Sequence, residues 1–234
     1  MRYVTAILLA AGKGLRLRSR IAKPLVRIGK RPIIIYSLKA LAKAPEVKEI
    51  IIVVNRRNSG QIYKQVRRFG VKKVKDIVLG GERRSDSVAN GLKAIGSATE
   101  MVLIHDGARP FIDRKTLSSV IKAAEKSGAA IAGVPVKATI KKVARGSCEV
   151  NTVKETIDRG SLWEIQTPQV FKKELILRAH KGPGRSLATD DSMLVERLGK
   201  RVSVVMGRYD NIKITTPEDL ILAKAISKEL CRKR

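Results

Sequence analysis

Aromatic residues, cysteine and acidic residues are scarce in this sequence. Only 3% of its 234 residues are aromatic, two are cysteine (Cys148 and Cys231), and no acidic residue precedes Glu46. The two cysteines have neither CxxC spacing nor a histidine cluster nearby, which argues against a disulfide framework and against a zinc site. Few aromatic rings are present to stack on single-stranded bases, so nucleic acid is not the expected partner.

Long apolar runs are also absent. No stretch of about 18 apolar residues could cross a bilayer, and residues 1–4 lead into a strand-like segment without the architecture of a signal peptide. We therefore expect a soluble, cytoplasmic protein without a membrane partner. A chain of 234 residues that is 44% hydrophobic can bury one sizeable core, so we expect a single domain over residues 1–234.

Positive charge dominates the composition. The sequence has 49 Lys and Arg against 21 Asp and Glu, a formal net charge of +28. Three explanations compete: a site for a polyphosphate substrate, an RNA-binding surface, and a lysine-rich solvated exterior. Most of the excess fits the third explanation, while a polyphosphate site needs only a few of the cations. RNA binding is kept as a minor hypothesis.

Short Val- and Ile-rich runs alternate with longer segments of helical periodicity. We expect buried strands at residues 4–9, 50–54, 101–104 and 129–134, and helices at 33–44, 61–69, 87–95 and 115–127. This alternation is typical of an α/β fold with a mostly parallel central sheet flanked by helices. Thr216, Pro217 and the acids after them predict a final helix from Pro217 toward Glu229, followed by a frayed tail from Cys231.

Residues 137–159 depart from this rhythm. Their pattern is alternating and polar, with Gly146 near the middle, which predicts an extended hairpin arm. A two-stranded arm is marginally stable alone, so we expect it to pack against the same arm of a second subunit.

The first strand ends in a segment of small and basic residues. Residues 10–16 read AAGKGLR, and Lys23 follows. Small residues let backbone N–H groups approach an anion, and the neighbouring cations suit a triphosphate. The spacing fits neither the Walker loop nor the dinucleotide fingerprint, and a plain tight turn is the alternative explanation.

Four further segments carry candidate functional residues. Residues 80–88, GGERRSDSV, predict a glycine turn followed by helix-capping Ser and Asp. Asp106, in HDGARP, follows an apolar strand, at the edge where open α/β sheets bind ligands and where a carboxylate can hold Mg²⁺. The alternative for Asp106 is a turn former that bonds its own backbone. Arg159 and Lys213, taken singly, are ordinary basic residues.

Taken in order, these segments resemble the 2-C-methyl-D-erythritol 4-phosphate cytidylyltransferases of the non-mevalonate isoprenoid route. The resemblance runs almost end to end and is carried by LLAAGKGLRL, GGERRSDSV, HDGARPF, PVKATIKK, TIDRGSLWEIQTPQVF, ATDD and GRYDNIKITTPEDL. It implies a Rossmann-like fold with a protruding β-arm, transfer of CMP from CTP to the polyol phosphate with Mg²⁺, and release of pyrophosphate. It also implies a homodimer whose arms complete each other's sites.

The resemblance also implies roles for individual residues. The residues that match the CTP site are Ala10, Ala11, Gly12, Gly14, Gly81, Glu82 and Ser87. Those that match catalytic residues are Arg16 and Lys23, which stabilise the transition state, and Arg159 and Lys213, which hold the nucleophile. Those that match the acceptor site are Asp106, Arg109, Thr139, Arg159 and Lys213, with Asp106 also at the metal and Thr139 and Arg159 acting in the partner subunit's site.

Two positions depart from the family pattern. Ala22 stands before Lys23 where the family usually has proline, with Pro24 after it, and Glu82 stands where aspartate is commoner. The alternatives are a ribitol 5-phosphate cytidylyltransferase, which shares most of these motifs, and a sugar-1-phosphate or molybdopterin nucleotidyltransferase, which lacks the combined HDGARP and DRGSLWEIQTPQ segments. A basic RNA-binding protein on a degenerate enzyme scaffold is the alternative of another class.

Overall fold

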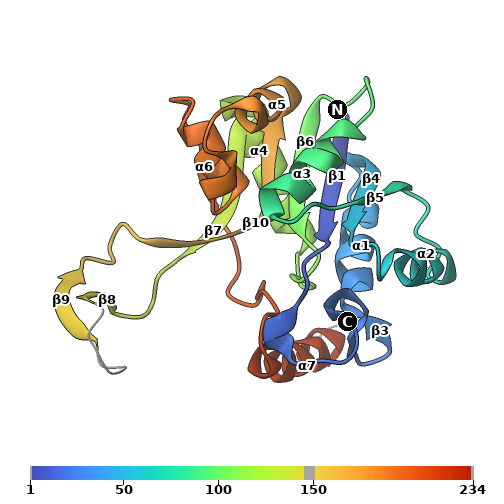
Figure 1. The fold of residues 1–234 in the computed structure, drawn as a ribbon, viewed down its shortest axis with the longest axis horizontal. Coiled ribbons are helices and arrows are strands. Elements are labelled where there is room, and N and C mark those ends of the chain that lie inside the picture. The colour runs from blue at the N-terminus through green and yellow to red at the C-terminus, as the bar shows by residue number, and fades with distance from the viewer. Residues whose placement is uncertain (1, 145–150, 233–234) are drawn as a thin grey trace.

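A seven-stranded sheet in the order β11-β7-β10-β6-β1-β4-β5 forms the centre of the protein (Figure 1). The computed structural model describes residues 2–144 and 151–232. The strands of this sheet are β1 (Val4–Ala10), β4 (Val47–Val54), β5 (Val74–Leu79), β6 (Met101–Asp106), β7 (Ala129–Pro135), β10 (Trp163–Lys172) and β11 (Ser203–Met206). All neighbours pair in parallel except β10, which is antiparallel to both β6 and β7.

Helices cover both faces of the sheet. They are α1 (Ile33–Lys43), α2 (Ser59–Arg68), α3 (Arg84–Lys93), α4 (Arg114–Ser127), α5 (Lys173–Lys181) and α6 (Asp191–Glu196). Apolar side chains of α1, α2 and α4 pack on one face, and those of α3, α5 and α6 pack on the other. The expected mostly parallel α/β sheet flanked by helices is confirmed.

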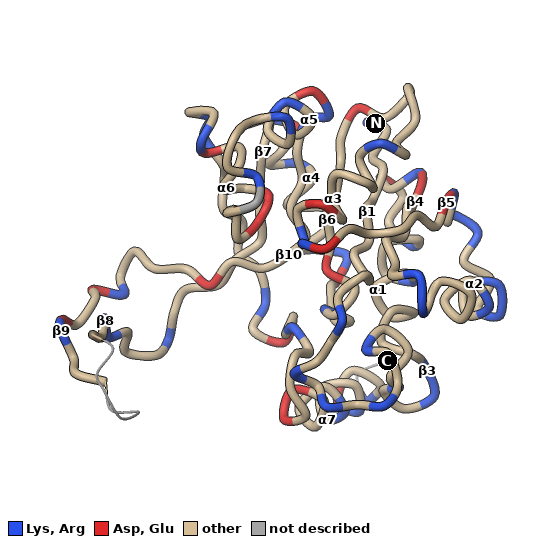
Figure 2. Tube along the Cα trace, in the orientation of Figure 1, with Lys and Arg blue, Asp and Glu red and all other residues tan. Residues whose placement is uncertain are grey.

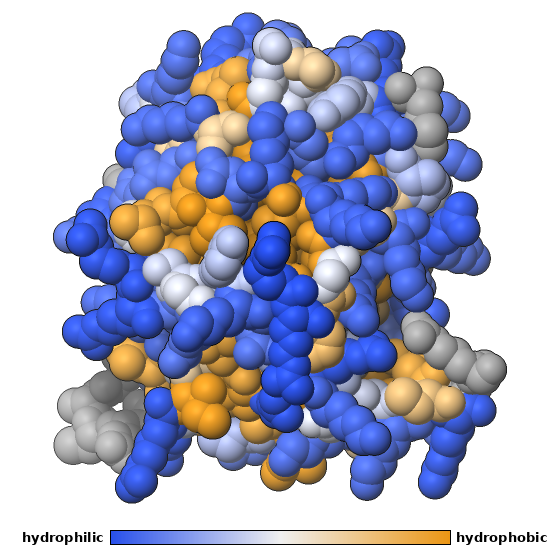
Figure 3. Space-filling model, turned by 90° about the vertical axis from the view of Figure 1, so that its right-hand side faces the viewer, coloured by the Kyte–Doolittle hydropathy of each residue, from blue (hydrophilic) through white to orange (hydrophobic). Residues whose placement is uncertain are grey.

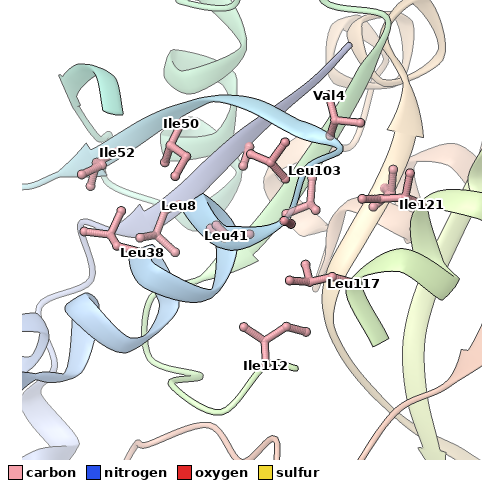
Figure 4. Packing of buried hydrophobic residues seen from close by; sticks show 14 of the residues in the cluster. Val4, Leu8, Leu38, Leu41, Ile50, Ile52, Leu103, Ile112, Leu117 and Ile121 are labelled. Carbon is pink, nitrogen blue, oxygen red and sulfur yellow. The ribbon is translucent and has the colours of Figure 1, made fainter. Parts of the chain in front are cut away.

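Successive side chains of β1 point to opposite faces of the sheet, and both faces are covered, so its run of apolar residues is continuous. Leu8 packs among α1 and the neighbouring strands (Figure 4), while Ile7 joins the core on the opposite face. Both side chains are fully buried. Each such burial is worth roughly 1.5–3 kcal/mol relative to exposure, so a strand that is apolar on both sides stabilises both helical layers at once.

A third, smaller core lies below the sheet in the view of Figure 1. It joins α7 (Pro217–Arg232) to the hairpin of β2 (Arg27–Ile28) and β3 (Arg31–Pro32). Two short 3-10 turns, η1 (Leu15–Leu17) and η2 (Lys23–Leu25), precede the hairpin, and a third, η3 (Arg185–Leu187), precedes α6. Leu17 and Ile214 are buried in this core, which fixes the glycine loop after β1 to the segment that precedes α7.

The predicted arm projects away from the sheet (Figure 1). Its strands β8 (Ile140–Ala144) and β9 (Thr152–Ile157) pair antiparallel as a separate two-stranded sheet. Val143 and Val153 are exposed there, at 46% and 54%. Gly146 and Cys148 lie outside the described residues.

The predicted strands and helices are confirmed, with bounds that differ by at most three residues. Among the elements not predicted are β5, β10 and α6. The predicted fraying from Cys231 is wrong for Cys231 and Arg232, because α7 continues through both. No helix in the described ranges has the length and apolar character needed to cross a bilayer.

Positive charge is spread over many elements. Lys and Arg lie on the arm, α2, α5 and α7 (Figure 2). The face shown in Figure 3 is mostly hydrophilic, with apolar side chains between the charged ones.

Candidate active site

A cavity of about 490 Å³ opens at the carboxyl end of β6. The cavity is lined by side chains from β6, β10, the start of α3, the residues around α6 and the segment before α7. Among the residues that line it are Arg84, Asp106, Arg109, Gln169, Asp190 and Lys213. The carboxyl end of a strand in an open α/β sheet is where such folds bind ligands, so this cavity is the candidate active site.

Asp106 is the charged residue at the end of β6 and is held by two cations. Lys213 Nζ lies 2.7 Å from its Oδ2 atom, and Arg84 Nε lies 3.5 Å from its Oδ1 atom. Burial alone would raise the pKa of Asp106, but the charges of Arg84 and Lys213 outweigh it and hold this pKa well below its usual range. The carboxylate is therefore ionised at neutral pH.

The loop after Asp106 is fixed by a buried histidine. His105 Nε2 lies 3.0 Å from the carbonyl oxygen of Arg109, which can only accept, so Nε2 donates. His105 Nδ1 then accepts from the Thr167 hydroxyl at 2.9 Å, and that hydroxyl accepts from the backbone N–H of Asp106. Burial, the main cause, lowers the pKa of His105 to about 4. The imidazole is neutral and positions both ends of the 106–109 loop.

Arg109 connects this loop to the segment before α7. Its Nη1 donates to the carbonyl oxygen of Asn211 at 2.7 Å, and Ile214 N donates to Ala108 O at 2.9 Å. Burial lowers the pKa of Arg109. Its Nε is buried and has no hydrogen-bond partner among the described residues, so one donor of a cation at the cavity is unpaired.

The glycine loop after β1 brings two more cations to this region. Gly14 has φ +67°, and a Cβ there would lie 2.9 Å from Cβ of Lys23, so the turn packs closely on Lys23. Lys23 Nζ donates to Ile214 O at 3.3 Å. Burial, followed by the charge of Lys213, lowers the pKa of Lys23, and Arg16 contributes in the same direction.

Lys23 and Arg16 differ in their exposure. Lys23 is half-buried while Arg16 is exposed, because η2 turns the Lys23 side chain toward Ile214. An added Cβ at Gly12 would meet open space, so packing within the protein does not explain that glycine.

The segment 80–87 lies against the glycine loop. A Cβ on Gly80 would lie 2.5 Å from Cβ of Ala11. Ser87 Oγ accepts from the backbone N–H of Gly81 at 3.2 Å, which bends this segment back onto α3. Glu82 is exposed.

The capping expectation for this segment is partly confirmed. Asp86 accepts from the backbone N–H of Arg83 at 3.2 Å and so caps α3. Ser85 lies inside the helix and is buried instead.

The arm residues are not brought to this cavity. Thr139 and Arg159 are exposed on the arm, and neither is among the described residues that line the cavity. Arg159 donates to the carbonyl oxygen of Lys137 at the base of the arm. Their expected role in a partner's site stays a prediction.

Several residues of the site were missed by sequence reasoning, although most lie inside the motifs. They are Arg84, His105, Thr167, Gln169, His180, Asp191 and Asn211. Arg84 Nη1 donates to Asp191 Oδ2 at 2.7 Å. Burial disfavours its charge, but Asp191 and Asp106 raise the pKa of Arg84 above its usual value. In a sequence with 49 basic residues, nothing in the local pattern distinguishes Arg84 as the one that makes this contact.

The donor set fits a hard divalent cation bound together with a polyphosphate. The described residues contain no group of three or more His, Cys, Asp and Glu side chains that could hold a metal by themselves. Mg²⁺ is usually bound by one or two carboxylates, with water and substrate phosphates completing its shell. The ionised Asp106 carboxylate at the cavity meets that requirement.

An α/β sheet with a glycine loop after β1, and a cavity that holds an ionised carboxylate and several cations, fits a nucleotidyltransferase. Residues 4–229 match the family model of IspD, 2-C-methyl-D-erythritol 4-phosphate cytidylyltransferase. The chain belongs to this family, and the predicted family is confirmed.

Known proteins resemble the chain over nearly its full length. The 2-C-methyl-D-erythritol 4-phosphate cytidylyltransferase of Alkaliphilus metalliredigens is 44% identical over 229 residues, which cover 95% of this chain and 92% of that protein. The enzyme of the same name from Geobacillus thermodenitrificans is 45% identical over 223 residues, which cover 94% of this chain and 95% of that protein.

Solved structures agree with this. The 4-diphosphocytidyl-2C-methyl-D-erythritol synthase of Anaerococcus prevotii is 33% identical with a TM-score of 0.83, covering 97% of this chain and 96% of that one. The cytidylyltransferase of Thermus thermophilus is 30% identical with a TM-score of 0.76, and the match covers 95% of this chain and 98% of that one. The Rossmann-like nucleotidyltransferase fold is thereby confirmed.

Proposed function

We propose that this protein transfers CMP from CTP to 2-C-methyl-D-erythritol 4-phosphate, giving 4-diphosphocytidyl-2-C-methyl-D-erythritol and pyrophosphate in the cytoplasm. The observation that carries this proposal is the pairing of Asp106 with Lys213 and Arg84 at the cavity, in a chain of the cytidylyltransferase family. One fixed anion surrounded by cations can accept a metal and two phosphate-bearing substrates.

The reaction joins two anions, so positioning and charge neutralisation supply the catalysis. A phosphate oxygen of the acceptor attacks the α-phosphorus of CTP in line. A new P–O bond forms while the bond to the β-phosphate oxygen breaks, and pyrophosphate leaves. The acceptor phosphate is already ionised, so no general base is required.

Each cation has a proposed part in this transfer. Lys23 and Arg16 neutralise charge that grows on the α-phosphate and on the leaving pyrophosphate. Lys213 and Arg109 bind the acceptor phosphate and hold it in line with CTP. Half-burial of Lys23 strengthens this effect, because a charge in a poorly solvated site is less screened.

The nucleotide is proposed to lie along the glycine loop and the 80–87 segment. Backbone N–H groups of residues 10–14 face the triphosphate, while Gly81, Glu82 and Ser87 lie where the cytosine binds. The contact between Gly80 and Ala11 supports this arrangement, since it places the two segments side by side.

Asp106 is proposed to bind Mg²⁺. When bound, Mg²⁺ would supply positive charge that offsets the negative charge of the CTP phosphates. Lys213 and Arg84 keep the Asp106 carboxylate ionised and in place until then.

The arm is proposed to serve a homodimer. Arg159 and Thr139 are exposed at a distance from their own cavity, and exposed Val143 and Val153 supply apolar surface for a second copy. In such a dimer Arg159 and Thr139 would contact the acceptor in the partner subunit's site, and Arg159 would act with Lys213 of that site.

The test is pyrophosphate release with CTP and Mg²⁺, comparing methylerythritol 4-phosphate with ribitol 5-phosphate and CTP with ATP, GTP and UTP. Selective turnover of CTP with the first acceptor is expected. Preference for ribitol phosphate would overturn the acceptor assignment and keep the mechanism. No release with any pair, together with tight and steeply salt-dependent RNA binding, would overturn the enzyme assignment.

A further inference from the structure

Four charged or titratable side chains form a chain that runs away from the cavity into the protein. Arg84 lies between two carboxylates, Asp106 at the cavity and Asp191 behind it. Asp191 is in turn bonded to His180 of α5, with His180 Nε2 3.0 Å from Asp191 Oδ1. The side chains of Asp191 and His180 are 1% and 4% exposed, so neither is available to a substrate.

Arg84 is shared unequally between the two carboxylates. Its Nη1 is 2.7 Å from Asp191, whereas its Nε is 3.5 Å from Asp106. The shorter contact is a charge-assisted hydrogen bond, and the longer one is an ion pair without that bond. The stronger partner therefore lies on the buried side and draws the guanidinium back from Asp106.

Asp191 is itself held in place from three directions. Its two carboxylate oxygens accept from Arg84 and His180, and its backbone N–H donates to Gln169 Oε1 at 3.2 Å. The charge of Arg84 and the hydrogen bond from His180 outweigh burial and lower the pKa of Asp191. Asp191 is thus a fixed buried anion, attached to β10 through Gln169 and to α5 through His180.

We infer that Asp191, held by His180, is a positioning residue that keeps Arg84 from pairing fully with the Oδ1 atom of Asp106 and so leaves that oxygen available to the metal–nucleotide complex. The inference rests on the proposed function and deepens it. A cation that pairs with Asp106 competes with Mg²⁺, because both need the same oxygens. Asp191 weakens one such competitor without touching a substrate.

Changes at the two buried members of this group, Asp191 and His180, have opposite expected effects. Asp191→Asn removes the buried anion, so Arg84 moves onto Asp106 and competes more strongly with Mg²⁺. His180→Leu removes one hydrogen bond from Asp191, which then has Arg84 as its remaining side-chain partner and draws it further from Asp106. A role limited to holding α5 and α6 in place would make both variants impair metal binding alike.

The experiment measures CTP binding by calorimetry without the acceptor, once with saturating Mg²⁺ and once with EDTA. The ratio of the two dissociation constants is the gain in affinity due to the metal. In Asp191→Asn this gain should shrink by roughly three- to tenfold, the effect of one charge-assisted hydrogen bond. In His180→Leu it should be unchanged or larger. Glu174→Gln, an exposed carboxylate on α5, is the charge-matched control and should equal the unmodified protein.

Each outcome decides a different claim. An unchanged gain in Asp191→Asn, or an equal loss in both variants, would overturn the positioning role while the proposed function stands. Absence of any Mg²⁺-dependent CTP binding by the unmodified protein would overturn the proposed function, and the inference with it. Thermal melting shows whether each variant is folded. If His180→Leu does not fold, the gain in CTP affinity due to Mg²⁺ is compared between Asp191→Asn and Glu174→Gln, and that comparison still tests the positioning role.

Discussion

Lys213 covers the carboxylate of Asp106 from the cavity side. Its Nζ lies 2.7 Å from Asp106 Oδ2, and the lysine side chain is 42% exposed while the aspartate side chain is 10% exposed. The pair links the end of β6 to the segment before α7. The ammonium is the exposed partner of the pair, so an arriving phosphate can reach and engage it.

Replacing Lys213 with methionine should weaken acceptor binding. We expect Lys213→Met to raise the KM for the acceptor by roughly tenfold or more, because one charge-assisted contact to its phosphate is lost. Steady-state kinetics with varied acceptor at saturating CTP measures this. Lys200→Met, at an exposed lysine before β11, is the control. An unchanged KM would contradict the role of Lys213.

Replacing Lys23 with methionine should reduce turnover without reducing stability. Lys23→Met should lower kcat by roughly 10²–10³-fold, as loss of one transition-state donor does. Its stem would still pack against Gly14. Lys30→Met, an exposed lysine in the turn between β2 and β3, is the matched control for kcat and for denaturation. A kcat close to that of the control would remove Lys23 from the mechanism.

The pH dependence of stability should reveal the charge on Lys23. The pKa of Lys23 is lowered in the folded protein, so the unfolded chain binds the proton more tightly, and this group contributes stability as pH rises through the window below 10.5. Lys23→Met should lack that rise and should be at least as stable at neutral pH. Denaturation in urea across this range measures both.

Acid should destabilise the protein through His105. The pKa of His105 is about 4 in the folded state against 6.5 unfolded, so the unfolded chain binds its proton first as pH falls. Stability present above pH 6.5 is then lost toward pH 4.

Between about pH 7.5 and about pH 4.5 this loss should reach roughly 2–3 kcal/mol. His105→Gln can keep both hydrogen bonds and has no such titration, so its loss should be smaller by that amount. Urea denaturation at the two pH values measures the difference. Equal losses in both proteins would show that His105 does not titrate as described.

The Thr167 hydroxyl should matter more than its methyl group. Thr167→Val keeps the shape and leaves the Asp106 N–H and His105 Nδ1 unpaired, which should cost roughly 2–4 kcal/mol of stability. Thr167→Ser keeps the hydroxyl and should stay close to the unmodified protein. Chemical denaturation of both variants is the measurement, and similar stabilities would refute the hydrogen-bonded chain.

Mixing two impaired variants should test the shared site. Arg159→Ala should raise the KM for the acceptor, and Lys23→Met should have little turnover. In an equal mixture half of the dimers are mixed, and one of their two sites has both residues, so activity should recover to about one quarter. Lys154→Ala, an exposed lysine on β9, is the control for Arg159→Ala. No recovery would argue for a site completed within one chain.

The sequence predicted the α/β class. The bounds of the strands and helices that it predicted lie within three residues of those in the structure. Continuous apolar runs, as in β1 and β4, are typical of strands buried on both faces. Strand β5 was missed because it lies at the sheet edge and is partly exposed. Strand β10 was missed because β10 combines polar residues such as Gln166 and Gln169 with its apolar ones.

Local sequence determined the strands, the helices and the order of the motifs, because periodicity and turn residues act over a few positions. Only the tertiary structure decided which cation meets which carboxylate. Arg84 pairs with Asp106 and Asp191, and Lys213 covers Asp106, because the fold brings together the end of β6, the start of α3, the start of α6 and the segment before α7. In a chain with 49 basic residues, such pairs depend on distance in space, which local patterns do not contain.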